Sequence, residues 1–573
     1  MGEQQKIKLV LCWHMHQPHY RDGMDGEYRL PWVYLHAIKD YTDMVAHLEN
    51  CPNAKVVVNF APVLLEQLDD YGGQMAGWLE RGQLMQDWLL NIVAGALPIP
   101  ADVPGRKKII DACQRCHAPT IIDTLPPFRY LTEIAQNYMH DAQAYEQMLL
   151  YLNDGFFRDL LMWYHLAWMG QSLRISDSRI QNLMDKAHGF TEVDQRVLVQ
   201  IIKDAVTGII PRYRALLESG QIELSTTPYG HPIVPLLLDF DSMREVMPNA
   251  PGPQYDNYPG GLERARWHMQ HGLDIFEEHF GQRPKGIWLS EGAVSIAAID
   301  LLDEFDVSWT ATGQGVWANS CRNAGTALHG VRCDQAYYRP VRYAEQKCAM
   351  FFRDDGLSDL IGFHYKSWKV EDAVNNFAQH LVNISNYLGA KASEHVVSVV
   401  LDGENAWEYY ANNANDFLSA LYKKLATHPR IELTTFSQAL KQGAAVTSLP
   451  VLTAGSWVYG SFSTWIGEQD KNLGWDILVE AKLAYDRVKA SNRLTEDELA
   501  AATTQLAICE GSDWFWWFGD YNPAESVSDF ELLYRHHIEK LYQLLGEEPP
   551  EILQQPISSG GGSMENSGTM RRS

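Results

Sequence analysis

Cysteine and basic residues are both scarce in this chain. The 573 residues contain 8 cysteines, too few for a disulfide scaffold, so free thiols in a reducing cytoplasm are the simpler interpretation. Lys and Arg total 47 against 72 Asp and Glu, which gives a formal net charge of -25. A chain this acidic repels phosphate backbones and anionic lipid surfaces, so neither nucleic acid nor a membrane is expected as a partner.

Long apolar runs are also missing. No stretch approaches the ~20 consecutive apolar residues of a transmembrane helix. The polar start, residues 1–8, lacks the apolar core of a signal peptide, so a cytoplasmic location is expected. Neither a Gly-rich phosphate loop nor an H-E-x-x-H motif occurs, so no cofactor is expected. Apolar residues still make up 46% of the chain, which is enough to form large cores and excludes disorder for most of it.

Short apolar segments rich in β-branched and aromatic residues alternate with helical patterns. Several are almost continuously apolar, which is typical of parallel strands covered on both faces. About seven repeats of strand and helix favour an α/β barrel over a sandwich. The segments predicted as strands are 9–14, 55–60, 222–226, 286–289, 307–310, 350–353, 396–401 and 431–434.

Two parts of the chain depart from this alternation. Residues from about 66 to 215 have the pattern of long helices, such as 139–167 and 191–218, and predict a helical insertion between two barrel strands. After about residue 440 the pattern is helical again. We therefore expect the barrel with its insertion at 1–445, a C-terminal helical domain that contributes to the cleft at 446–557, and a disordered Gly/Ser-rich tail at 558–573.

Two of the predicted strands end in carboxylates. The segment 286–289 is followed by Glu291, and the segment 396–401 by Asp402. Because parallel strands of a barrel end at one rim, these two side chains are expected to lie near each other. One ionised carboxylate and one that holds a proton form the arrangement that cleaves glycosidic bonds. The 18 Trp and 27 Tyr also suit stacking on sugar rings. The sequence therefore favours a carbohydrate-active barrel.

Two assignments have alternatives at this point. His14, His16 and His19 fall within six residues and could bind a metal ion or donate hydrogen bonds to a polar ligand. Asp354 and Asp355 also follow a predicted strand and are rivals for the role of acid. The residues alone leave both questions open.

Five strings, taken in order, resemble the five sequence regions of glycoside hydrolase family 57. They are residues 13–20, 222–233, 286–292, 399–408 and 510–520. The string 465–472 and the Asp-Gly-Glu-Asn string at 402–405 resemble the α-amylase and amylopullulanase branch. One departure is Leu289, where that branch commonly has Pro.

The resemblance implies an incomplete (β/α)7 barrel with a helical C-terminal part and a retaining reaction on α-glucans or malto-oligosaccharides. It implies that Glu291 is the nucleophile and that Asp402 is the proton donor, in preference to Asp354 or Asp355. Trp288, Trp407 and Trp514 are expected to be stacking walls. No metal is required. The expected substrate-binding residues are His14, His16, Gln17, Tyr229, His231, Trp288, Glu404, Trp407, Asp513 and Trp514.

The acceptor of the sugar decides between related activities. Water as acceptor gives hydrolysis of α-1,4 bonds, with α-1,6 bonds as a further candidate, and the branch-like strings favour this outcome. A second glucan as acceptor gives a 4-α-glucanotransferase or a branching enzyme. Two other classes stay open: a metal-dependent polysaccharide deacetylase, because of the clustered His, and a non-catalytic glucan-binding protein. The oligomeric state is not predicted.

Overall fold

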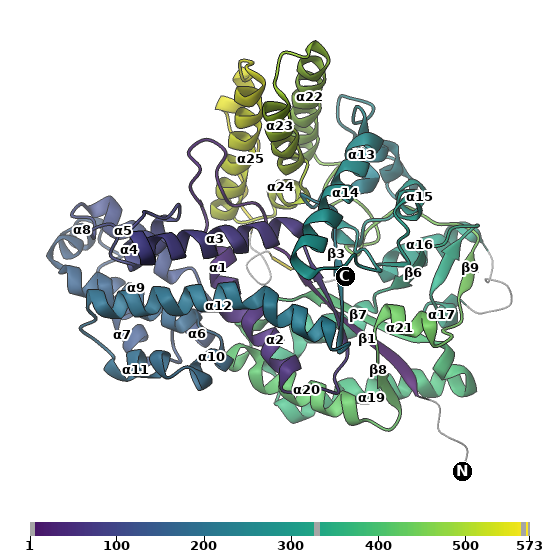
Figure 1. Ribbon diagram of the computed structural model, residues 1–573, viewed down its shortest axis with the longest axis horizontal. Coiled ribbons are helices and arrows are strands. Elements are labelled where there is room, and N and C mark those ends of the chain that lie inside the picture. Colours follow the sequence, from purple (N-terminus) through teal and green to yellow (C-terminus); the bar gives the residue numbers. More distant parts are fainter. Residues whose placement is uncertain (1–5, 326–332, 563–568, 571–573) are drawn as a thin grey trace.

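A long parallel strand lies at the centre of the molecule (Figure 1). A computed structural model describes residues 6–325, 333–562 and 569–570. All nine residues of β1 (Ile7–Met15) are buried. It pairs in parallel with β2 (Val56–Phe60), β7 (Val396–Asp402) and β8 (Ile431–Leu433), and β2 pairs with β3 (Ile222–Thr226). These strands were predicted correctly because a strand covered on both faces is a continuous apolar run.

A second, smaller sheet continues this arrangement. Its strands are β4 (Trp309–Thr312), β5 (Val341–Tyr343), β6 (Ala349–Phe352) and β9 (Thr447–Leu449), of which β5 and β9 were not predicted. Isolated parallel bridges join the sheets at both ends: Ile287 pairs with Thr226, Gly286 with Trp309, and Arg353 with Ser398. The fold is the incomplete (β/α)7 barrel with a helical insertion and a C-terminal helical part.

The segment predicted as a strand at 286–289 forms only these bridges. A Cβ on Gly286 would lie 1.8 Å from the Trp309 ring, so a residue without a side chain is needed for this close approach. The chain then leaves the sheet in a short 3-10 turn, Ser290–Gly292. The prediction of a regular strand was therefore wrong, although the segment lies where a strand between β3 and β4 was expected.

Helices cover the outside of the strands. One of them, α14, has sharply defined ends, because Gly260 and Gly281 in the left-handed region precede and follow it. The helices of this layer are α1 (Trp32–His36), α2 (Thr42–Glu49), α13 (Val234–Leu238), α14 (Gly261–Phe280), α15 (Ile296–Glu304), α16 (Gln314–Ala324), α17 (Cys333–Ala336), α18 (Asp355–Asp359), α19 (Val370–Leu388), α20 (Asn415–Thr427) and α21 (Phe436–Lys441).

The insertion between β2 and β3 is helical, as predicted. Thr191 caps its last helix. The Thr191 side chain accepts a hydrogen bond from Asp194 N, and the Asp194 carboxylate accepts one from the backbone N of Thr191. The predicted helix 139–167 is two helices, because the side chain of Asn153 caps the second one. The helices are α3 (Pro62–Arg81), α4 (Trp88–Val93), α5 (Val103–Gln114), α6 (Ala118–Ile121), α7 (Pro126–Ala135), α8 (Ala142–Tyr151), α9 (Asp154–Trp168), α10 (Gln171–Ser176), α11 (Ser178–Lys186) and α12 (Glu192–Glu218).

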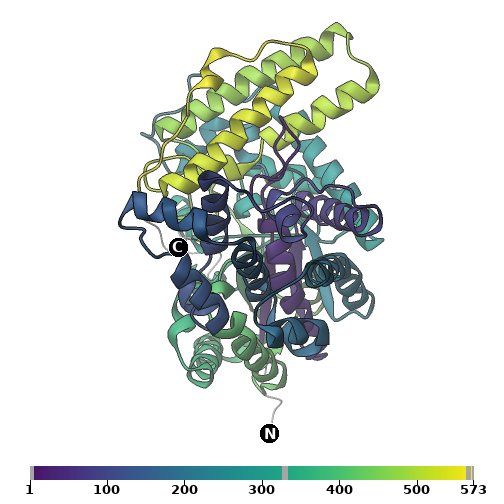
Figure 2. The ribbon, with the colours of Figure 1, turned by 90° about the vertical axis from the view of Figure 1, so that its left-hand side faces the viewer.

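The C-terminal part is a helical bundle that projects from the barrel (Figures 1 and 2). It consists of α22 (Gln469–Ser491), α23 (Glu496–Cys509), α24 (Ser512–Trp517) and α25 (Ala524–Leu545). The boundary expected at 445 falls just before β9, which pairs with β5 of the barrel. No helix among the described residues is long and apolar enough to cross a membrane.

Part of the tail that was expected to be disordered is packed. Ser558 is 5% exposed and its hydroxyl accepts a hydrogen bond from Gly519 N, 2.9 Å away. Met570 is 7% exposed and lies against Gly362. The expectation does not hold for residues 558–562 and 569–570, and the rest of the tail lies outside the described residues.

Candidate active site

The ends of β1 and β7 bring a histidine beside a carboxylate. His14 and Asp402 are register partners in this strand pair. The Nδ1 of His14 is 2.7 Å from Oδ1 of Asn59, which extends from β2. Burial, followed by the proximity of His16, lowers the pKa of His14 to about 3, so the ring is neutral and can donate only from one nitrogen.

Asp402 is the first of two carboxylates after β7. Burial raises its pKa to about 6, while a hydrogen bond from Asn405 Nδ2 to Oδ2, at 2.9 Å, acts in the opposite direction. The chain turns directly after it, because a Cβ on Gly403 would lie 2.1 Å from the Met15 sulfur. Asp402 can therefore hold a proton at mildly acidic to neutral pH, as a general acid must.

The second carboxylate on this turn, Glu404, is 2% exposed. Its Oε1 accepts from the backbone N of His16 and from Nε2 of Gln17, both at 3.3 Å, and its Oε2 is buried without a partner among the described residues. Burial, together with the nearby charges of Asp402 and Asp40, raises the pKa of Glu404 well above its usual value. Both effects favour the protonated form of Glu404 over the ionised form.

Glu291 sits in the 3-10 turn that follows the bridges to β3 and β4. Its backbone is left-handed, with φ of 59°, which is strained for a residue with a side chain. Trp457 holds it from two sides: the indole Nε1 donates to Oε2 at 2.9 Å, and the backbone N of Trp457 donates to the Glu291 carbonyl at 3.1 Å. The carboxylate is thereby fixed in one orientation.

Sequence reasoning missed Trp457. It lies after β9, in a loop that was assigned to the C-terminal helical domain. A Trp in a Gly/Ser-containing loop is a weak signal, because nothing in the local sequence says which distant carboxylate its indole faces.

His231 lies between Glu291 and His16. Its Nδ1 is 4.0 Å from Oε1 of Glu291, and its ring stacks on His16 with centroids 3.9 Å apart. Burial, then the proximity of His16 and His14, lowers the pKa of His231 far below its usual value, so it is a neutral donor or acceptor. On the far side, Nε2 of His16 contacts Oδ1 of Asp513 at 2.8 Å.

A cavity of about 600 Å³ lies against these groups. His231 is 1% exposed and lies behind the lining rather than on it. Glu291 and Asp402 both line the cavity, together with His14, His16, Gln17, Glu404 and Asp513. Its walls come from the barrel rim, from the insertion and from α25. Aromatic residues of the lining that were not predicted are Trp32, Trp168, Tyr409, Trp457, Trp516 and Phe530.

The structure does not place the three expected stacking walls on this lining. Trp407 and Trp514 are each 1% exposed, and their indoles donate to the carbonyls of Gly403 and Ile508. Trp288 is fully buried and packs edge-on against Trp457. These three Trp therefore support the site from the core, and the expectation that they face the cleft is corrected.

Tyr229 is likewise buried, at 1% exposure, and packs against Trp267 and His271. The rivals for the acid also lie elsewhere: Asp354 caps α18 by accepting from Leu357 N at 2.8 Å, and Asp355 pairs with Arg353 at 2.7 Å. Neither aspartate lines the cavity.

The histidine cluster could be considered a metal site. His14, His16 and His231 offer ring nitrogens within 4.8 Å of one another. The planes of the stacked His16 and His231 rings, however, differ by only 18°. An imidazole binds a metal along a lone pair in its ring plane, so two stacked rings do not direct their lone pairs to one point. The cluster fits hydrogen bonding to a polar ligand better than zinc binding, which disfavours the deacetylase alternative.

Comparison with known proteins agrees with this geometry. The family model of glycosyl hydrolase family 57 matches residues 10–451. No match was found among curated protein sequences. A branching enzyme of this family from Pyrococcus horikoshii is 16% identical, with a TM-score of 0.55 over 98% of this chain and 99% of that one.

Two further solved structures are about equally similar to this chain. A branching enzyme from Thermococcus kodakaraensis is 17% identical, with a TM-score of 0.55 over 94% of this chain and 90% of its own. The α-amylase AmyC from Thermotoga maritima is 13% identical, with a TM-score of 0.55 over 96% of each chain. At these identities the likeness concerns the fold alone, and it does not distinguish the activities.

Proposed function

The chain belongs to glycosyl hydrolase family 57, and from this premise we propose that it cleaves α-1,4-glucosidic bonds of an α-glucan or malto-oligosaccharide. As a member of the family it is a glycoside hydrolase-type enzyme of the retaining class. The observation that carries the proposal is the pair Glu291 and Asp402 in one cavity, held in unlike surroundings. In such a pair, one carboxylate acts as the nucleophile and the other carboxyl group acts as the acid.

In the first step, a carboxylate oxygen of Glu291 attacks the anomeric carbon. The glycosidic bond breaks as Asp402 gives its proton to the leaving oxygen, which leaves a covalent glycosyl-enzyme. In the second step, Asp402 takes a proton from water, and the resulting oxygen attacks the anomeric carbon and releases Glu291. Two inversions give net retention.

The surroundings of each carboxylate support these roles. The donor Trp457 and the strained backbone of Glu291 fix the nucleophile before substrate arrives, which lowers the cost of alignment. Burial keeps a proton on Asp402 to about pH 6. The neutral His14 and the buried Glu404, whose raised pKa favours its protonated form, offer hydrogen-bonding groups to sugar hydroxyls.

Transfer to a second glucan, by a 4-α-glucanotransferase or branching reaction, is the second candidate. The observation that favours it is the aromatic lining contributed by Trp168, Trp516 and Phe530, because apolar walls disfavour water at the acceptor position. Both reactions share the first step, and so the identity of the acceptor must be measured.

A product profile of the wild-type protein and Glu291→Gln tests the proposal. Each is incubated with maltoheptaose, amylose and pullulan, and products are separated by length. Hydrolysis gives short products and one new reducing end for each bond that is cleaved. Release of maltotriose from pullulan reports cleavage of its α-1,6 bonds. Transfer gives longer or branched chains without new reducing ends.

We expect Glu291→Gln to lose turnover by a factor of about 10⁴ or more while still binding glucan, since the covalent step is lost. Appreciable turnover by this variant would remove Glu291 from the role of nucleophile. A wild-type protein that leaves every glucan unchanged would overturn the substrate assignment and favour a glucan-binding protein.

A further inference from the structure

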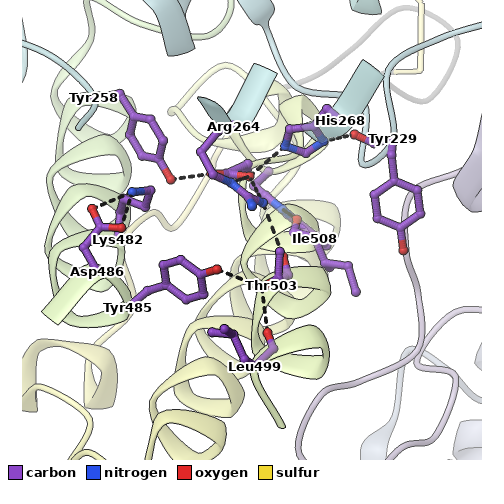
Figure 3. Close-up of polar contacts among 12 residues, drawn as sticks. Tyr229, Tyr258, Arg264, His268, Lys482, Tyr485, Asp486, Leu499, Thr503 and Ile508 are labelled. Atoms are coloured by element: carbon purple, nitrogen blue, oxygen red, sulfur yellow. Dashed lines mark hydrogen bonds and ion pairs between the residues drawn. The ribbon is translucent and has the colours of Figure 1, made fainter. Parts of the chain in front are cut away.

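A buried ion cluster joins the barrel to the C-terminal bundle. Glu510, fully buried at the end of α23, accepts from Arg264 Nε at 2.8 Å and Nη2 at 2.7 Å, and from the Tyr258 hydroxyl at 2.6 Å. The Nε2 of His268 lies 2.7 Å from its Oε2. Figure 3 draws Tyr258, Arg264 and His268 together at this junction. A buried charge is tolerated only with such partners, so the cluster holds α14 and α23 in one relative position.

A first segment leads from this cluster to the cavity through Tyr229. The backbone N of Tyr229 donates to the His268 carbonyl at 3.0 Å, and Nδ1 of His268 hydrogen-bonds the Tyr229 carbonyl. A Cβ on the next residue, Gly230, would lie 2.5 Å from the carbonyl oxygen of Ala507 in α23. The segment is therefore clamped between the two helices before it reaches His231.

A second segment leads from Glu510 itself. Two residues later, Ser512 N donates to the His231 carbonyl at 2.9 Å, and the Ser512 hydroxyl is 2.9 Å from Nδ1 of His231. The next residue, Asp513, contacts His16 at 2.8 Å. Both segments thus end on the stacked His16 and His231 rings.

The backbone at His231 needs this support. Its φ is 57°, in the left-handed region that a residue with a side chain seldom adopts. Such strain persists only where surrounding contacts over-determine the conformation. The clamp by α14 and α23 supplies these contacts, and the outcome is a histidine nitrogen 4.0 Å from the Glu291 carboxylate.

We propose that Glu510 is a positioning residue. Through Arg264 and His268 it fixes the two segments that place His231 beside Glu291 and Asp513 against His16. The C-terminal bundle thereby helps to shape the active site. This inference rests on the proposed function, because it takes Glu291 to be the nucleophile.

The test is Glu510→Gln, analysed in a double-mutant cycle with His231→Ala. Glutamine keeps the shape but removes the charge and one acceptor, so the two segments lose their common anchor. We expect kcat to fall about 10- to 100-fold with KM changed less than about threefold, as expected when reacting groups are misplaced. Because Glu510 acts through His231, the double variant is expected to be no slower than the slower single variant.

Asp486→Asn is a control in the same bundle, at a more exposed ion pair. Asp486 also forms an ion pair in the bundle, with Lys482 at 2.5 Å, and is drawn in the same view (Figure 3). It has no contact with the segments that reach His231 among the described residues. We expect Asp486→Asn to leave kcat unchanged, which separates loss of an ion pair from loss of positioning.

Three results would overturn the inference: wild-type kcat in a folded Glu510→Gln protein, a loss in kcat that is additive with His231→Ala, or an equal loss in Asp486→Asn. If Glu510→Gln does not fold, Tyr258→Phe replaces it, since it removes one donor and keeps the charges. We expect a loss in kcat of about twofold to fivefold there, because one of the donors to the Glu510 carboxylate is removed. An unchanged kcat would again overturn the inference. Failure of the proposed function is distinct, because the wild-type protein would then leave every glucan unchanged, or Glu291→Gln would retain turnover.

Discussion

Two buried glutamates, Glu404 on the cavity lining and Glu510 at the junction of α14 and α23, have pKa values shifted in opposite directions. Glu510 has Arg264, His268 and Tyr258 around it, and these partners lower its pKa to about 2 despite complete burial. Glu404 is 2% exposed, accepts from two donors at 3.3 Å within the described part of the chain, and has a pKa raised well above its usual value. Equal burial therefore does not set the charge of a carboxyl group; the donors supplied to it do.

The difference corresponds to two roles: Glu510 stabilises the structure, and Glu404 is available to a ligand. An ionised glutamate with every acceptor position filled cannot exchange partners cheaply, and it suits the joint between α14 and α23. A glutamate whose raised pKa favours the protonated form, and which has one oxygen unpartnered among the described residues, can offer a proton to a ligand hydroxyl. It suits the lining of a cavity. Each of the following predictions changes one side of this comparison.

The largest expected effect is on stability. Glu510→Leu leaves the Arg264 guanidinium buried without its counter-charge, so we expect the free energy of unfolding to fall by ~3–5 kcal/mol. Glu404→Leu removes a neutral acid, for which the loss of its hydrogen bonds is ~1 kcal/mol. Thermal and denaturant unfolding of the two variants measures the difference. Equal losses would show that the two carboxyl groups carry the same charge.

The sequence predicted the carboxylates but not this difference between them. Strand ends in parallel sheets meet at one rim, so Glu291 and Asp402 could be placed together from periodicity alone. Glu404 and Glu510 lie in equally acidic, aromatic-rich strings, and their charge states depend on donors 242 to 388 residues away along the chain. Such long-range contacts leave no mark on local sequence.

For the aromatic residues, the sequence predicted the wrong side chains on the cavity wall. Trp407 and Trp514 stand beside carboxylates, and this pattern is the same for a stacking wall and for a core residue. Their indole N–H groups are satisfied by nearby carbonyls, so they pack inward. The cavity instead receives Trp32 and Trp168 from segments without any sequence motif, because helix packing determines which ring reaches the cavity.

A smaller effect is expected in the pH profile. The acid form of Asp402 is needed in the first step, and its fraction falls as pH rises through about 6. We therefore expect kcat/KM to decline about tenfold per pH unit well above that value. Asn405→Leu removes a donor that favours the ionised form, which makes Asp402 more like Glu404, and should move this alkaline limb to higher pH. A limb that stays in place or moves down would contradict the role of Asn405.

The smallest effect is expected for Glu404→Gln. Glutamine has the shape of a protonated glutamic acid and keeps an oxygen for His16 N and Gln17, so replacing a neutral acid changes little. We expect kcat/KM at neutral pH to stay within about threefold of wild type, the scale of a fraction of one hydrogen bond. The matched change Asp402→Asn removes a transferable proton and is expected to be severe on substrates with poor leaving groups. A loss of kcat/KM in Glu404→Gln as large as that in Asp402→Asn would mean that Glu404 acts in its ionised form. Burial with few donors would then not be enough to keep Glu404 protonated.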